Sequence, residues 1–276
     1  MKFTTIANAK KQTGLSYLGN IGSSAKTTRS KDFSHQYTYA VYLSPANVSG
    51  YNVCPFSTKE CRLGCLATSG RAKIEYHTGT SMIADARKKK TILFHENKDF
   101  FMQWLIAEIK SGKAKADRDG FFFSVRLNAT SDIDWNEVYY KGFNIFEIFP
   151  DIVFYDYTKN HNKFDNIAKN YHLTYSYTGR NWNQSKKLLD KGFNIAVVFN
   201  VKKESDLPLT WNGYKVVNGD LTDYRIDDAK GIIVGLKWKN IGNKAVNNEI
   251  KNGIFVVQPT DFESNNVQVQ TAAAGM

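Results

Sequence analysis

Apolar segments of strand length recur along most of this 276-residue chain and alternate with helix-length stretches. Eight of them are rich in the β-branched and aromatic residues that favour strands. They cover residues 37–45, 121–128, 152–158, 172–178, 194–201, 214–220, 231–239 and 253–259. Apolar strands that alternate with helices are typical of parallel sheets. The sequence therefore predicts an α/β fold, a full or partial (β/α) barrel with mostly parallel strands.

Helical periodicity predicts the intervening helices and, with composition, the domain layout. The predicted helices cover residues 81–94, 98–110, 135–149, 162–170 and 183–192. Residues 1–35 are polar, and we expect an irregular N-terminal segment there. We expect one barrel-like domain over residues 36–262. The small, polar residues 263–276 are predicted to form a disordered tail.

Composition narrows the setting in which such a protein works. The formal net charge is +11, which allows binding to nucleic acid, although the basic residues are scattered along the chain. No apolar run reaches the roughly 18 residues of a membrane-spanning helix, so no membrane partner is expected. The N-terminal residues lack the apolar core of a signal peptide, and we expect a cytoplasmic protein with reduced thiols. The sequence does not specify the oligomeric state.

All three cysteines fall in one twelve-residue window, as Cys54, Cys61 and Cys65. This window directly follows the first predicted strand, and its many polar residues, with Pro and Gly, predict a loop. Cys thiolates select zinc or iron–sulfur clusters, and an odd number of cysteines argues against a disulfide framework. We therefore expect the three cysteines to bind one [4Fe–4S] cluster.

A [4Fe–4S] cluster normally takes four thiolates, so three would leave one iron open to a substrate or a small molecule. Three function classes follow: an enzyme that uses this open iron, a redox or regulatory cluster protein without a substrate, and a zinc-stabilised nucleic-acid-binding module. Zinc needs four ligands, and His77, twelve residues after Cys65, is the candidate fourth. Free thiols are the simplest alternative.

Polar residues stand at the ends of the predicted strands or just beyond them. In parallel α/β folds these ends share one face, where ligands bind. We expect a small-molecule site between the cysteine loop and Asn128, Asp132, Lys159, Tyr177, Asn200, Asp220 and Lys237. The catalytic candidates are Asp132, Lys159, Tyr177, Asp220 and Lys237, and the candidates for ligand binding are Asn128, Asn200 and Asp220.

Ordinary structural roles compete with this interpretation. Asp132 is in a position typical of a helix N-cap, and Asp220 could form a surface ion pair of little energetic worth. Gly219 and Gly235 would suit a close approach of the backbone to a ligand or cluster.

Two motifs carry a resemblance to a known family. The cysteine loop, with Cys54-Pro55, Cys61, Cys65 and Ser69-Gly70-Arg71, and the late segment 219–239 resemble the phage "gene product eighty-eight" family. The resemblance covers roughly residues 50–260 in patches and implies a phage origin. The activity of that family is not established.

A looser resemblance is to radical S-adenosylmethionine enzymes, which place three cysteines in the loop after the first strand of a partial barrel. That resemblance implies S-adenosylmethionine as a ligand of the open iron. The chain departs from it in cysteine spacing, with six and then three intervening residues. It also has Arg126-Leu127-Asn128 where those enzymes have a Gly-Gly-Glu pattern.

Overall fold

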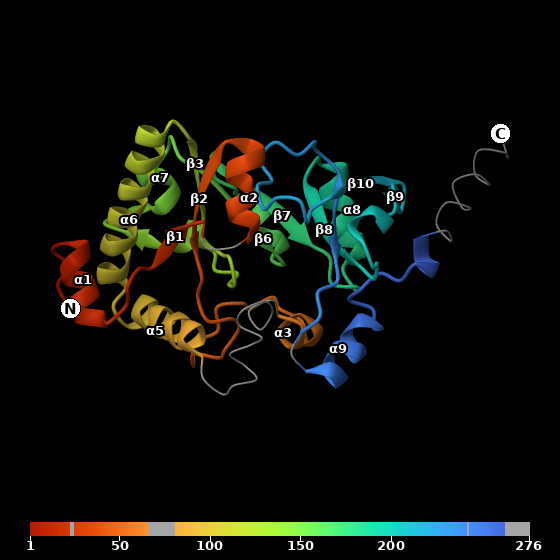
Figure 1. Cartoon of the computed structure of the whole chain (residues 1–276), viewed down its shortest axis with the longest axis horizontal. Helices are drawn as coiled ribbons and strands as arrows, with labels where there is room; N and C mark the ends of the chain where they lie inside the picture. The colour runs from red at the N-terminus through yellow and green to blue at the C-terminus, as the bar shows by residue number, and fades with distance from the viewer. Residues whose placement is uncertain (23–24, 66–80, 242, 263–276) are drawn as a thin grey trace.

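The frame of the molecule is a nine-stranded sheet (Figure 1). The computed structural model describes residues 1–22, 25–65, 81–241 and 243–262. The strands lie in the order β1 (Gly19–Ile21), β2 (Gln36–Val41), β3 (Phe122–Arg126), β6 (Val153–Thr158), β7 (Tyr171–Ser176), β8 (Asn194–Phe199), β11 (Ile233–Lys237), β10 (Tyr214–Asn218) and β9 (Thr210–Trp211).

The sheet is parallel except at its two edges. Strands β2, β3, β6, β7, β8 and β11 follow one another in chain order, and β10 adds a further parallel strand beside β11. The edge strands β1 and β9 are antiparallel to their neighbours. In the described part of the chain β1 and β9 do not pair with each other, so the sheet stays open. The predicted α/β class and mostly parallel sheet are confirmed, and the prediction of a full barrel is wrong.

Helices cover the sheet and connect its strands. They are α1 (Ile6–Thr13), α2 (Ala25–Ser34), α3 (Lys59–Leu63), α5 (Met82–Glu96), α6 (Lys98–Asp119), α7 (Ile145–Ile148), α8 (Trp182–Asp190) and α9 (Lys244–Lys251). Helix α6 packs against β1, β2 and β3, and α8 packs against β7 and β8. Helix α2 lies against β2, and the short α3 meets α9.

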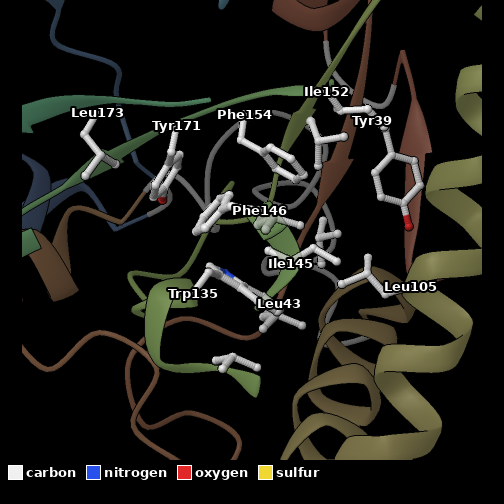
Figure 2. Packing of buried hydrophobic residues seen from close by; sticks show 14 of the residues in the cluster. Tyr39, Leu43, Leu105, Trp135, Ile145, Phe146, Ile152, Phe154, Tyr171 and Leu173 are labelled. Carbon is white, nitrogen blue, oxygen red and sulfur yellow. The ribbon is translucent and has the colours of Figure 1, made fainter. Parts of the chain in front are cut away.

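One face of the sheet carries the main hydrophobic core. Side chains alternate between the two faces of a strand, and the core face presents Val125, Phe154, Ile195 and Ile233, all fully buried. Figure 2 shows the aromatic part of this core, where the rings of Phe146 and Tyr171 stack 4.3 Å apart.

The opposite face is smaller and more polar. It presents Arg126, Tyr157, Ser176, Ala196 and Leu236, all of which line a cavity. Ser176 and Ala196 have small side chains, which leave room for a ligand on this face.

The N-terminal 35 residues are more regular than the sequence indicates, because they contain α1, β1 and α2. Helix α1 begins at a cap in which the Thr5 hydroxyl accepts the amide of Asn8, and ends at Gly14 with a φ of 68°. Both helices are short and polar, and α1 buries only Ala9, so few apolar residues mark them in the sequence.

Two other predicted elements are also wrong. The expected helix 135–149 is a 3₁₀ turn, η2 (Trp135–Glu137), the hairpin strands β4 (Tyr139–Tyr140) and β5 (Phe143–Asn144), and α7. The two hairpin-turn residues, Lys141 and Gly142, both have positive φ, as tight hairpin turns require. The expected last strand, 253–259, contributes only a single bridge between Val257 and Phe199.

Two further differences are smaller. The expected helix 162–170 is a single 3₁₀ turn, η3 (His161–Phe164). Another 3₁₀ turn, η4 (Glu204–Asp206), lies in a segment for which the sequence predicts no element. The predicted tail, residues 263–276, lies outside the described residues.

Candidate functional site

A cavity of about 600 Å³ lies on the polar face of the sheet and reaches the carboxyl ends of its parallel strands. Its floor is formed by β3, β6, β7, β8 and β11. Lys26 and Arg29 from α2 line another part of it, and the cysteine loop supplies a further wall. This volume is within the usual range for small-molecule sites, about 300–1,000 Å³.

All three cysteine side chains line this cavity, although they come from different parts of the loop. The Cys54 sulfur accepts the amide of Ala46 at 3.4 Å and lies 3.9 Å from the carbonyl oxygen of Thr130. Cys61 is in α3, and Cys65 follows Gly64, the C-cap of that helix. Each thiol is partly buried.

The cysteine loop is held from both sides. The amide of Asp132 donates to the carbonyl oxygen of Val53 at 2.7 Å, which ties the start of the loop to the end of β3. At the other side Cys61 packs against a small hydrophobic cluster, which contains Trp238, Ile241, Ile250, Phe255 and Val256. A β-carbon at Gly64 would lie 3.1 Å from the Trp238 ring, so only glycine fits there without a shift of its neighbours.

Burial and the neighbouring acidic groups disfavour an isolated thiolate here. The pKa of Cys54 is raised to about 11, mainly by burial and to a smaller extent by Asp132, Cys65 and Cys61, against the opposing amide of Ala46. Burial lowers the pKa of Lys159, but the adjacent Cys61 and Asp132 more than offset this, so its net shift is upward. The lysine ammonium is therefore the positive charge placed beside the thiols.

The donor chemistry suits a soft metal, because three sulfurs face one cavity. The side chains are not arranged as a closed metal site, however. In the described ranges no three His, Cys, Asp or Glu side chains are close enough to hold one ion. His77 and Arg71 lie outside the described residues. A cluster would therefore require the three thiols to converge from the positions that they occupy here.

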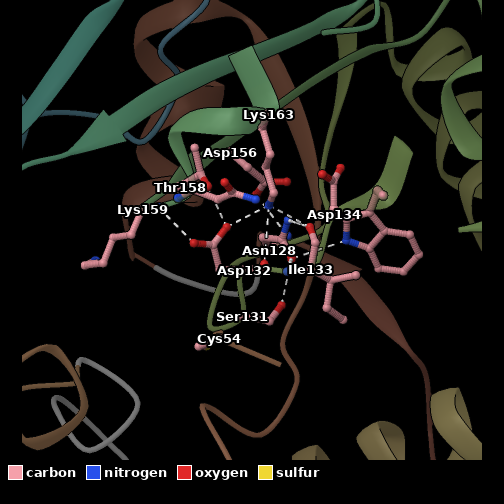
Figure 3. A network of polar contacts seen from close by, with 12 residues as sticks. Cys54, Asn128, Ser131, Asp132, Ile133, Asp134, Asp156, Thr158, Lys159 and Lys163 are labelled. Atoms are coloured by element: carbon pink, nitrogen blue, oxygen red, sulfur yellow. Dashed lines mark hydrogen bonds and ion pairs between the residues drawn. The ribbon is translucent and has the colours of Figure 1, made fainter. Parts of the chain in front are cut away.

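Asp132 connects the cavity to the buried polar network of Figure 3. Its carboxylate accepts the Thr158 hydroxyl at 2.7 Å, the amide of Lys159 at 2.8 Å and the ammonium of Lys163 at 2.7 Å. Lys163 is 3% exposed, so this ion pair is largely shielded from water. Asp132 is not the expected N-cap. That role falls to Asp134, whose side chain accepts the amide of Asn136.

Asn128 is used mainly to shape the turn after β3. Its side-chain oxygen accepts the Ser131 hydroxyl, the Ile133 amide and the Trp135 indole N–H, and its side-chain nitrogen donates to the carbonyl of Ile133. Asn128 also lines the cavity. The same turn contains Thr130, whose hydroxyl donates to the carbonyl oxygen of Leu43 at 2.6 Å.

Asp220 joins α2 to the end of β11. Its carboxylate pairs with Lys26 at 2.8 Å and Lys239 at 3.0 Å, and accepts the amide of Lys237 at 2.7 Å. Burial acts to raise the pKa of Asp220, but Lys26, the Lys237 amide and Lys239 outweigh it and lower the pKa to about 2. Asp220 is 2% exposed and is not the surface ion pair that the sequence also allows.

The structure brings most of the residues of the expected small-molecule site together at this cavity. The lining includes Asn128, Asp132, Lys159, Tyr177, Asp220 and Lys237. Asn200 lies outside it, and its side chain donates to Gln258 at 2.8 Å, which fastens β8 to the segment before the C-terminus.

The two glycines serve packing rather than a ligand. A β-carbon at Gly219 would collide with Val234, and one at Gly235 would lie 2.7 Å from Val216.

Sequence reasoning missed a buried ion pair on the cavity floor. Arg126 of β3 pairs with Asp223 and lies over the ring of Tyr157 at 5.1 Å. An arginine inside the apolar run FFFSVRLN is an available signal, because a charged residue within a buried strand needs a partner. Lys26 and Arg29 gave no such signal, since they stand in a segment that reads as irregular.

The whole-chain comparison decides the family. The model of the family described as Gene product 88 matches residues 3–253. The chain belongs to the Gene product 88 family. The match confirms the resemblance to the phage family and extends it well before the cysteine loop. Among curated proteins and among solved structures, nothing matches this chain.

In this Gene product 88 protein, the range that the family model matches contains all the residues that line the cavity except Phe255. The resemblance to radical S-adenosylmethionine enzymes receives no support from these comparisons. None of the described helices is long and apolar enough to cross a membrane.

Proposed function

We propose that this protein binds a [4Fe–4S] cluster through Cys54, Cys61 and Cys65 and acts on a small molecule in the adjoining cavity. The observation that carries the proposal is that three thiols from one loop line a cavity with a set of charged and polar side chains. A bound cluster with three thiolate ligands would supply one open iron as a Lewis-acid or redox centre.

The residues of the chain would then have separate tasks. Lys159, beside Cys61, would offset the negative charge of the thiolates. Asp132 holds Lys159 through its backbone amide and the cysteine loop through Val53. Asp220, Lys237 and Tyr177 line the remaining cavity, where a substrate would contact them. We do not include S-adenosylmethionine, because the cysteine spacing and the Arg126-Leu127-Asn128 segment depart from the enzymes that use it.

Zinc is the competing metal, and a bound zinc ion would support the alternative function, a zinc-stabilised nucleic-acid-binding module. A structural zinc site needs four protein ligands, and only three sulfurs face the cavity. A non-catalytic cluster protein is the second alternative. The large cavity, which combines charged and apolar side chains, favours an enzyme, because a pure electron carrier has no use for a substrate-sized space.

Spectroscopy of the loaded protein tests the proposal. The full chain is incubated without oxygen, either with iron and sulfide or with zinc, and then desalted. We expect visible absorption and raised thermal stability after the iron and sulfide treatment. Cys54→Ser should abolish both effects, whereas Ser176→Ala, a control without a thiol in the same cavity, should retain them. Stabilisation by zinc alone, with a colourless protein, would contradict the proposal.

A further inference from the structure

The cavity has more positive than negative side chains. Among the described residues, seven lysines and arginines line it, against three aspartates. Each aspartate already has a basic partner: Asp132 pairs with Lys163, Asp220 with Lys26 and Lys239, and Asp223 with Arg126. Lys163 is not among the lining residues, so the charge of Asp132 is balanced from behind the cavity wall. The cavity therefore has a surplus of positive charge.

Part of this surplus gathers at one corner. Lys26 and Arg29 are three residues apart on α2, a spacing that places them on one face of a helix. Lys26 contacts Asp220, and Asp220 accepts the amide of Lys237. Asp220 therefore brings α2 and the end of β11 together. We call Lys26, Arg29, Lys237 and Lys239 the basic corner, and Asp220 is the carboxylate at its centre.

Two members of the corner have charges that no carboxylate in the described part of the chain balances. Among the described residues neither Arg29 nor Lys237 forms a salt bridge with a carboxylate, although both are partly buried and line the cavity. Lys26 and Lys239 share a single carboxylate. Like charges held close together in a partly buried site are unfavourable unless an anion joins them.

We propose that the basic corner binds the phosphate group of a phosphorylated small molecule. A phosphate carries about −1.5 to −2 charges at neutral pH, which matches the surplus better than the single charge of a carboxylate. Arginine suits bidentate binding of phosphate, and lysine adds a point charge. The neighbouring Val198, Leu236 and Trp238 would face the organic part of the ligand. The inference rests on the proposed function only in that it names the substrate class of the same cavity.

Calorimetric titration of the full chain with inorganic pyrophosphate tests the corner without assuming the organic part. We expect binding that weakens with added salt, and a loss of about tenfold or more in affinity for Arg29→Gln and for Lys237→Gln. Arg29→Lys, which keeps the charge, should retain most of the binding and shows that the fold tolerates a change at this position. Arg118→Gln and Lys215→Gln, at exposed positions, are the matched controls.

Three outcomes would overturn the inference. The first is no pyrophosphate binding at millimolar concentration, and the second is an affinity in Arg29→Gln and Lys237→Gln equal to that of the native chain. The third is tighter binding of succinate than of pyrophosphate. The titration is repeated with Cys54→Ser, which removes a proposed cluster ligand. Pyrophosphate binding by a native chain that does not load iron would sink the cluster and leave the phosphate site. Iron loading without pyrophosphate binding would do the reverse.

Discussion

Single carboxylates organise the cavity by joining segments far apart in the sequence. Asp132 joins the cysteine loop, β6 and Lys163, and Asp220 joins α2 to β11. Both groups are nearly buried, so their partners matter more than those of surface ion pairs. Removing the charge from either carboxylate would take away a counter-charge that buried or half-buried lysines contact directly.

Asp220→Asn should destabilise the protein by about 3 kcal/mol, because it removes the carboxylate charge that both Lys26 and Lys239 contact. Urea denaturation of the full chain measures this free energy of unfolding. Asp190→Asn removes an exposed helical pair with Lys186 and should cost at most about 0.5 kcal/mol. Equal losses in the two variants would show that Asp220 has no special role.

Asp156 should make stability depend on pH. Burial raises the pKa of Asp156 to about 7, against the opposing effects of Arg126 and the amide of Asn128. The pKa in the unfolded chain is about 3.9. Between these values the folded protein holds a proton that the unfolded chain has lost, so this carboxyl makes stability fall as the pH rises from about 4 to 7.

Asp156→Asn removes that titration while keeping an oxygen that can accept the amide of Asn128. The stability of the variant relative to the native chain should therefore rise between about pH 4 and pH 7, by up to about 4 kcal/mol. Urea denaturation at several pH values measures the difference. A constant difference across this range would mean that Asp156 titrates normally in the folded protein.

Among the elements, the short helix α3 depends on packing that lies far away in the sequence. It has only five residues, which is too short for stability of its own. Its support comes from α9 and from the small cluster around Trp238 and Ile250. The position of Cys61 is therefore set by the C-terminal part of the chain.

Ile250→Ala should cost about 3 kcal/mol and loosen α3. Ile109→Ala, on the buried face of α6, should cost a similar amount and leave α3 in place. Labelling of Cys61 with a thiol reagent, in chains that carry Cys54→Ser and Cys65→Ser, reports this difference. We expect labelling several times faster with Ile250→Ala than with Ile109→Ala, and equal rates would contradict the role given to α9.

The sequence predicts the long apolar elements well and the polar ones poorly. Strand β8 presents Ile195, Val197 and Phe199 to the core, and β6 is rich in aromatic residues, so their patterns are clear. Helix α1 is closed by Thr5 and Gly14, and α2 makes contacts such as that of Lys26 with Asp220, which no local pattern reveals. The hairpin at Lys141-Gly142 depends on a turn with positive φ at a lysine, a weak signal.

At the site, the same distinction applies. Positions at strand ends could be placed from the sequence because parallel strands end at one face. Whether a side chain there faces the cavity depends on its partners, as Asn200 shows by its bond to Gln258. The basic corner could not be predicted, since Arg29 and Lys237 are more than 200 residues apart and meet only through the fold.

At the scale of the whole molecule, an open parallel sheet leaves one face free to form a cavity. The core face is covered by α6 and α8, and the cavity face by α2 and the cysteine loop. This arrangement places three thiols and a basic corner in one space of about 600 Å³. The function proposed for this cavity therefore depends on whether the three thiols bind one cluster together.

Iron and sulfide content per chain, measured after anaerobic reconstitution and desalting, tests this most directly. The native protein should retain about four irons and about four sulfides. Cys54→Ser, Cys61→Ser and Cys65→Ser should each lose most of both, because all three thiols serve one cluster, and Ser57→Ala should lose neither. A native chain that retains no iron, or that loses none when one cysteine is replaced, would contradict the account.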